Sequence, residues 1–81
     1  MLPIEQDGNR SIIDVRELIL NGVHPRNQII EYVRNCPEGT VVEIHLPHPA
    51  PPLVGALESL GLMCVMNELE PGHFRVLTVK R

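Results

Sequence analysis

Residues 40–46 have the sequence Thr-Val-Val-Glu-Ile-His-Leu, and this stretch predicts a β-strand with two different faces. It is rich in β-branched residues, which favour strands, and its apolar and polar side chains alternate. Glu43 and His45 share one face, because successive side chains of a strand point to opposite sides of the sheet. The residues of the apolar face are Val42, Ile44 and Leu46.

A proline-rich stretch follows this strand and leads into a predicted helix. Proline has no backbone N–H, so the stretch excludes the interior of a strand or a helix. Pro51 or Pro52 suits the first position of a helix, and Gly61 suits the C-terminal cap. The other prolines of the stretch are Pro47 and Pro49, and the apolar stripe of the helix is Leu53, Ala56, Leu57 and Leu60.

The C-terminal part of the chain predicts a β-hairpin. Residues 62–69 and 73–80 are the two strands, and the turn between them is Glu70-Pro71-Gly72-His73. Proline followed by glycine at the central positions suits a type II turn, whose second central residue needs a positive φ.

The chain before residue 40 predicts one strand and one helix. Residues 12–16 form the strand, with Asp14 and Arg16 on one face and Ile13 and Val15 on the other. Pro25 opens a helix that stops near Asn35, and its apolar stripe is Ile29, Ile30 and Val33. Residues 1–11 are polar and are predicted to be an N-terminal lead-in or a short edge segment.

These elements predict a single domain over residues 12–81, in the α/β class as an α+β two-layer sandwich of order βαβαββ. Right-handed crossovers would place both helices on one face of a four-stranded mixed sheet. The open face would then carry Asp14, Arg16, Glu43 and His45. We expect this face to be partly solvated or to form a dimer surface.

Charge and composition exclude several classes of protein. The 81 residues carry a formal net charge of −3, and the aromatic residues are Tyr32 and Phe74, so we expect no nucleic-acid binding. The apolar stretches are too short to span a membrane. Cys36 and Cys64 lack the spacing of a metal motif. We expect no secretory leader, and therefore reduced thiols in a cytoplasmic protein.

Four short motifs occur in the order found in one family. They are Asp14-Val15-Arg16 on the first strand, His24-Pro25 at the first helix, His48-Pro49-Ala50-Pro51-Pro52-Leu53 before the second helix, and Glu70-Pro71-Gly72-His73-Phe74-Arg75-Val76 at the hairpin. Over residues 12–80 the chain resembles the TusA/SirA-like superfamily of small sulfur carriers. It is most similar to the branch of unknown function that accompanies hemerythrin-like and cupin-like modules.

The resemblance implies the fold of a sulfur carrier without its chemistry. Carriers of this family begin the first helix with Cys-Pro-x-Pro, whereas this chain has His24-Pro25-Arg26-Asn27. A thiol at a helix N-terminus is activated by the helix dipole and by free N–H groups. Cys36 lies past the predicted end of the first helix and Cys64 lies within a strand, so we expect no sulfur relay.

The predicted topology brings a set of polar residues to one edge of the sheet. Ligands of α/β proteins bind outside the carboxyl ends of parallel strands, where the helices start. If residues 62–69 run parallel to residues 40–46, the turn at Pro71-Gly72 reaches the same edge. The predicted ligand or partner edge consists of Asp14, Arg16, His24, Pro25, Arg26, His48 and His73.

Three functions remain open for this edge. The first is a non-enzymatic module that binds a protein partner or forms a homodimer through this edge or the open sheet face, or holds an anion with Arg16, Arg26, His24 and the helix N–H groups. The second is a metal-binding or redox-accessory protein, with a transition metal as cofactor held by His24, His48 and His73. The third is the disfavoured sulfur relay. No nucleophile and base pair is evident, so we predict no catalytic residue.

Overall fold

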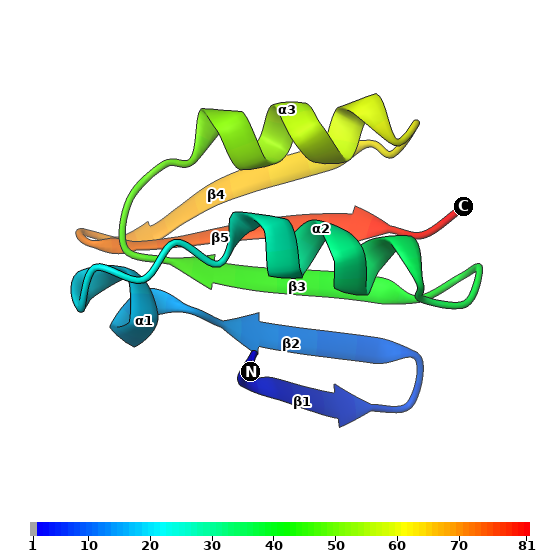
Figure 1. Ribbon diagram of the computed structural model, residues 1–81, viewed down its shortest axis with the longest axis horizontal. Helices are drawn as coiled ribbons and strands as arrows, with labels where there is room; N and C mark the ends of the chain where they lie inside the picture. The colour runs from blue at the N-terminus through cyan, green and yellow to red at the C-terminus, as the bar shows by residue number, and fades with distance from the viewer. Residues whose placement is uncertain (1) are drawn as a thin grey trace.

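The computed structural model describes residues 2–81 as an α+β structure with a mixed sheet of five strands (Figure 1). The strand order in the sheet is β1-β2-β3-β5-β4. The strands are β1 (Ile4–Asp7), β2 (Arg10–Asp14), β3 (Val41–Leu46), β4 (Cys64–Glu70) and β5 (His73–Val79). The helices are α1 (Arg16–Leu20), α2 (Arg26–Arg34) and α3 (Pro51–Ser59).

Strand β3 is the centre of the sheet, and its alternation determines which side chains are buried. It pairs parallel with β2 and antiparallel with β5, so Ile44 lies opposite Ile13 on one side and opposite Val76 on the other. All three side chains are 0% exposed. The prediction that the face with Val42 and Ile44 is the apolar face of this strand is confirmed.

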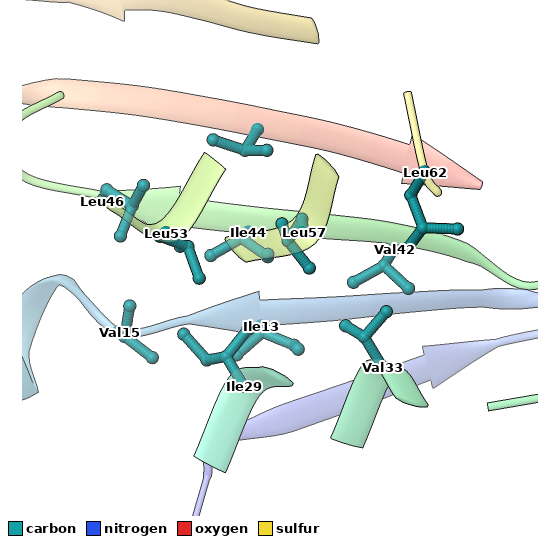
Figure 2. Close-up of a cluster of buried hydrophobic side chains, with 11 residues drawn as sticks. Ile13, Val15, Ile29, Val33, Val42, Ile44, Leu46, Leu53, Leu57 and Leu62 are labelled. Atoms are coloured by element: carbon teal, nitrogen blue, oxygen red, sulfur yellow. The ribbon is translucent and has the colours of Figure 1, made fainter. Parts of the chain in front are cut away.

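Helices α2 and α3 cover this apolar face with matching stripes. Ile29 and Val33 of α2, and Leu53 and Leu57 of α3, form one buried cluster with the strand residues (Figure 2). The two residues of each pair are four positions apart and therefore lie on one side of their helix. Among residues 2–81, no helix has both the length and the apolar content that crossing a bilayer requires.

The predicted number of strands is wrong, because the sheet has five strands and not four. The additional strand is β1, which lies within the stretch predicted to be a lead-in or a short edge segment. It pairs antiparallel with β2 through a tight turn at Gly8, whose φ of 63° suits glycine. Most of its side chains are polar and exposed, as is common for an edge strand, so its sequence shows no apolar alternation.

The first predicted strand is displaced, and the helix α1 that follows it was not predicted. Strand β2 begins at Arg10 and ends at Asp14, and residue 16 already belongs to α1. The Asp14 carboxylate accepts a hydrogen bond from the Arg16 backbone N–H at 3.2 Å, which satisfies a donor that the helix start leaves free. The helix is only five residues long, which is too short to produce a clear periodic pattern.

The strand directions bring three loops to the same edge of the sheet. Strands β3 and β4 each pair antiparallel with β5 and therefore run in the same direction, which is also that of β2. The hairpin turn at Pro71-Gly72 therefore lies at the edge where β2 and β3 end (Figure 1). Gly72 has a φ of 79°, as the second central residue of a type II turn requires.

The buried centre of β3 predicts a measurable difference between two truncations. We expect Ile44→Ala to lower the free energy of unfolding by about 2–5 kcal/mol, because it removes methyl groups from a fully enclosed site. The control is Val65→Ala on β4, at a side chain that is 56% exposed, with an expected loss below about 1 kcal/mol. Urea denaturation measures both values, and equal losses would contradict this assignment of the core.

Candidate functional site

The sheet divides the predicted edge into two pockets on its opposite sides. The first, which we call the helix-side pocket, has a volume of about 480 Å³ and lies between the starts of α2 and α3. The second, which we call the sheet-face pocket, has a volume of about 410 Å³ and lies on the face opposite the helices. The helix-side pocket contains His24, Pro25, Arg26 and His48, whereas the sheet-face pocket contains Asp14, Arg16, His45 and His73.

The lining of the helix-side pocket is apolar with a few basic or neutral polar groups. Arg26 is its single charged side chain, and no aspartate or glutamate borders it. The other polar residues are His24, Asn27 and His48. Its apolar lining is Ile19, Pro25, Ile29, Leu46, Pro49, Ala50, Pro52 and Leu53. A concave apolar site with a few polar groups is typical of small-molecule binding.

The two helix starts at this pocket differ in the hydrogen-bond donors that they offer. Helix α2 has no side-chain cap at its N-terminus. Helix α3 begins with Pro51 and Pro52, which have no N–H, and the N–H groups of Leu53 and Val54 both donate to the Ala50 carbonyl, at 3.0 and 3.1 Å. The start of α2 is therefore the one suited to an anion, and that of α3 is not.

His48 is held in one tautomer at the rim of the helix-side pocket. Its Nδ1 atom lies 2.9 Å from the carbonyl oxygen of Pro49. A carbonyl oxygen accepts hydrogen bonds only, so Nδ1 carries the proton and Nε2 of the neutral ring keeps its lone pair.

A chain of hydrogen bonds on the sheet-face side joins Glu43, His45 and His73. Oε2 of Glu43 lies 2.6 Å from Nε2 of His45, and Nδ1 of His45 lies 2.7 Å from Nε2 of His73. These side chains are 11%, 14% and 17% exposed, so the chain is largely shielded from water. We call these three residues the Glu-His-His chain.

Glu43 is the acceptor at one end of the Glu-His-His chain, and this fixes which nitrogen donates in each of its hydrogen bonds. The Glu43 carboxylate only accepts, so His45 donates from Nε2. The Nδ1 atom of a neutral His45 then has a lone pair and accepts from Nε2–H of His73. The remaining nitrogen of His73, Nδ1, faces Oε1 of Glu70 at 3.8 Å. The outer nitrogen of the Glu-His-His chain is therefore Nδ1 of His73, at the end nearest Glu70.

Asp14 and Arg16 form a bidentate ion pair at the edge of the sheet-face pocket. The Arg16 Nε and Nη2 atoms lie 3.0 and 2.8 Å from the two carboxylate oxygens. These hydrogen bonds hold the pKa of Asp14 below its ordinary value, against the opposing effect of partial burial. The predicted anion-binding set of Arg16, Arg26 and His24 is thus not brought together, because Arg16 is paired on the sheet-face side.

The structure does not bring together the three histidines predicted to hold a metal. His24 and His48 line the helix-side pocket, while His73 lies in the sheet-face pocket with the sheet between them. Within residues 2–81 there is no group of three His, Cys, Asp or Glu side chains placed to hold an ion. Histidine 73 pairs instead with His45.

Sequence reasoning placed His45 on the open face but did not connect it to His73. The two residues are 28 positions apart, and their meeting depends on the register that places Leu46 opposite Phe74. The signal available in the sequence is the spacing of Glu43 and His45, which places a carboxylate and an imidazole on the same face of one strand.

Both cysteines lie in surroundings that disfavour the thiolate. Cys36 follows the C-terminus of α2, and Cys64 is the first residue of β4. Burial raises the pKa of each thiol, and this effect exceeds the opposing hydrogen bonds from Tyr32 and Thr78. Neither cysteine borders the helix-side pocket.

Comparisons with known proteins add no functional information. A scan against protein-family models, a search of curated proteins and a search of solved structures each found no match to this chain.

The raised pKa values predict slow chemistry at both thiols. At pH 7 we expect iodoacetamide to modify Cys36 and Cys64 more slowly in the folded chain than in the urea-unfolded chain, because the folded state holds less thiolate. Mass spectrometry of time points gives both rates, and the same measurement at pH 9 should show the folded-state rates rising with the thiolate fraction. Faster alkylation of either cysteine in the folded chain at pH 7 would contradict this assignment.

Proposed function

We propose that this chain is a non-enzymatic binding module of TusA-like fold without the carrier cysteine, and that the helix-side pocket is its ligand site. The proposal of a TusA-like fold is supported by the order β2, α2, β3, α3, β4, β5 and by His24-Pro25 at the start of α2, where the carriers have Cys-Pro. The rest of the proposal depends on the lining of the pocket.

The observation that carries the proposal is the contrast between this pocket and the whole chain. The chain has a formal net charge of −3, yet the pocket is bordered by an arginine, two histidines and no acidic residue. The uncapped start of α2 adds the positive end of a helix dipole. The electrostatic potential of the pocket therefore favours an anion.

The apolar part of the lining defines the rest of the ligand. Leu46, Leu53 and Ile29 belong to the core, and their outer atoms form the floor and wall of the pocket. A volume of about 480 Å³ lies within the range of pockets that hold small molecules. A fully hydrated ion such as phosphate would leave this apolar surface uncovered. The ligand class is therefore a small organic anion, namely a carboxylate with an apolar body.

The location of the pocket supports the same conclusion. It lies where β3 ends and where α2 and α3 begin, which is the edge at which α/β sheets bind ligands. The residues there suit non-covalent binding, because both half-buried thiols lie elsewhere. Arg26 would pair with the carboxylate of the ligand, and the side chains of α3 would contact its apolar body.

Octanoate and the matched alcohol octanol test this proposal on the full chain. We expect octanoate to shift the methyl NMR signals of Ile29, Leu46 and Leu53 in a saturable manner, and octanol to bind about tenfold more weakly because it lacks the charge. Arg26→Gln should weaken octanoate binding by a similar factor. The matched control is Arg34→Gln at the opposite end of α2, where the arginine pairs with Glu31 in solvent.

Two results would reject the assignment of this pocket. One is equal binding of octanoate to the Arg26→Gln variant and to the unmodified chain. The other is a set of shifted signals that lies on the sheet-face side, away from α2 and α3.

A further inference from the structure

We propose that His45 and His73 form a binding site for a divalent transition-metal ion, which takes the place of the proton between their facing nitrogens. The two rings come from neighbouring strands, with Nδ1 of His45 2.7 Å from Nε2 of His73. Their centroids are 5.0 Å apart and the ring planes are inclined by 42°. Neutral imidazole nitrogen is a good ligand for copper, zinc and nickel, so this pair offers the first two ligands of a site.

The partners of the outer nitrogens carry the proposal. Nε2 of His45 is hydrogen-bonded to the Glu43 carboxylate at 2.6 Å, and Nδ1 of His73 faces the Glu70 carboxylate at 3.8 Å. Histidines that bind metals almost always donate their second N–H to a carboxylate, a carbonyl or water, which fixes the tautomer and raises the basicity of the ligating nitrogen. His45 has such a carboxylate partner at hydrogen-bond distance, and the exposed Glu70 carboxylate lies 3.8 Å from the outer nitrogen of His73, within reach of a small side-chain movement.

The neutral imidazoles of His45 and His73 keep the same number of protons when the metal ion binds. In the metal-free chain, His45 donates from Nε2 to Glu43, and His73 donates from Nε2 to the lone pair of His45. On binding, the proton of His73 moves from Nε2 to Nδ1, which faces the Glu70 carboxylate at 3.8 Å in the metal-free chain, and the exposed Glu70 side chain then moves in to accept it. Two lone pairs then face the ion. No proton leaves the pair, and nothing is oxidised or reduced.

Metal binding requires the facing nitrogens of His45 and His73 to move slightly apart at the end of the sheet. With metal–nitrogen distances near 2.1 Å and tetrahedral angles, the two nitrogens would lie about 3.4 Å apart. His73 is the first residue of β5, and the pairing of β4 with β5 shifts register between Glu68 and Glu70. The strand end beside the turn can therefore take up the movement while the buried centre of the sheet stays in place.

Charge and space around the pair suit a cation with water as its further ligands. Arg75 lies opposite His45 on the same sheet face, and its Nη2 atom is 3.4 Å from Oδ1 of Asn67. Arg10 approaches Glu43 at 3.9 Å and Arg16 is held by Asp14, so Glu43 and Glu70 are the carboxylates that offset the charges of the ion and of Arg75. Both histidines border the sheet-face pocket, which gives the site access to solvent. The described residues place no third His, Cys, Asp or Glu ligand around the pair, so water fills the open positions.

Calorimetric titration of the chelator-treated full chain with Cu²⁺ and with Zn²⁺ tests the proposal. We expect one ion per chain, with Cu²⁺ bound more tightly than Zn²⁺, as the Irving–Williams order requires. His73→Ala should weaken binding by at least about tenfold, and Glu43→Gln by about tenfold through the orientation of His45. The control carries His24→Ala and His48→Ala together, which removes the two exposed histidines and should leave the affinity unchanged.

A spectroscopic readout distinguishes this site from adventitious surface binding. Addition of Zn²⁺ should move the ¹⁵N signals of Nδ1 of His45 and Nε2 of His73 and leave those of His24 and His48 in place. His73→Gln serves in place of the alanine variant if circular dichroism shows that the latter does not fold.

The proposal fails if the His73 variant binds Cu²⁺ as tightly as the unmodified chain, if the double variant loses binding, or if the ring signals of His45 and His73 do not move. Binding of octanoate in the helix-side pocket is independent of each of these results.

Discussion

Alternation along β3 is the constraint on which the rest of the structure depends. Val42, Ile44 and Leu46 are buried in the core, so Glu43 and His45 must point to the opposite face. A shift of one residue in register would place a carboxylate and an imidazole in the core and expose its central side chains. The burial of the apolar face thereby fixes the position of the Glu-His-His chain.

The same alternation keeps two different chemistries apart. Core residues of β3 and α3 form the apolar floor of the helix-side pocket, and Arg26 and the start of α2 give it positive charge. The sheet-face pocket lies on the face that α2 and α3 leave uncovered, and its polar side chains pair with one another, Asp14 with Arg16 and His45 with His73. The proposed organic anion and the proposed metal ion would therefore bind on opposite faces of the same sheet.

Much of the fold could be predicted because its signals are local. The strand at residues 40–46, the helix starts near Pro25 and Pro51, and the turn at Pro71-Gly72 each depend on periodicity or on the backbone chemistry of proline and glycine. Helix α1 was missed because it is short, and the stretch that contains β1 was left open between a lead-in and a short edge segment. Strand β1 is stabilised by pairing with β2, and α1 lacks enough turns to show a periodic stripe.

The candidate site was harder to predict than the fold. Sequence reasoning gathered His24, His48 and His73 at one edge, since the strand directions place all three there. It did not resolve which side of the sheet each residue faces, and this decides which side chains meet. The contact between His45 and His73 depends on a register between strands far apart in sequence, and no local pattern records that register.

The most direct measurement of this account is the tautomeric state of His45 in the metal-free chain, read from ¹⁵N–¹H correlations of the imidazole rings at pH 8. The account predicts that His45 is protonated at Nε2, with a strongly hydrogen-bonded proton shared with Glu43, and that its Nδ1 atom has the shift of an acceptor. Protonation of His45 at Nδ1 alone would contradict the account, because Glu43 would then receive no hydrogen bond from His45 and the order of donors in the Glu-His-His chain would be wrong.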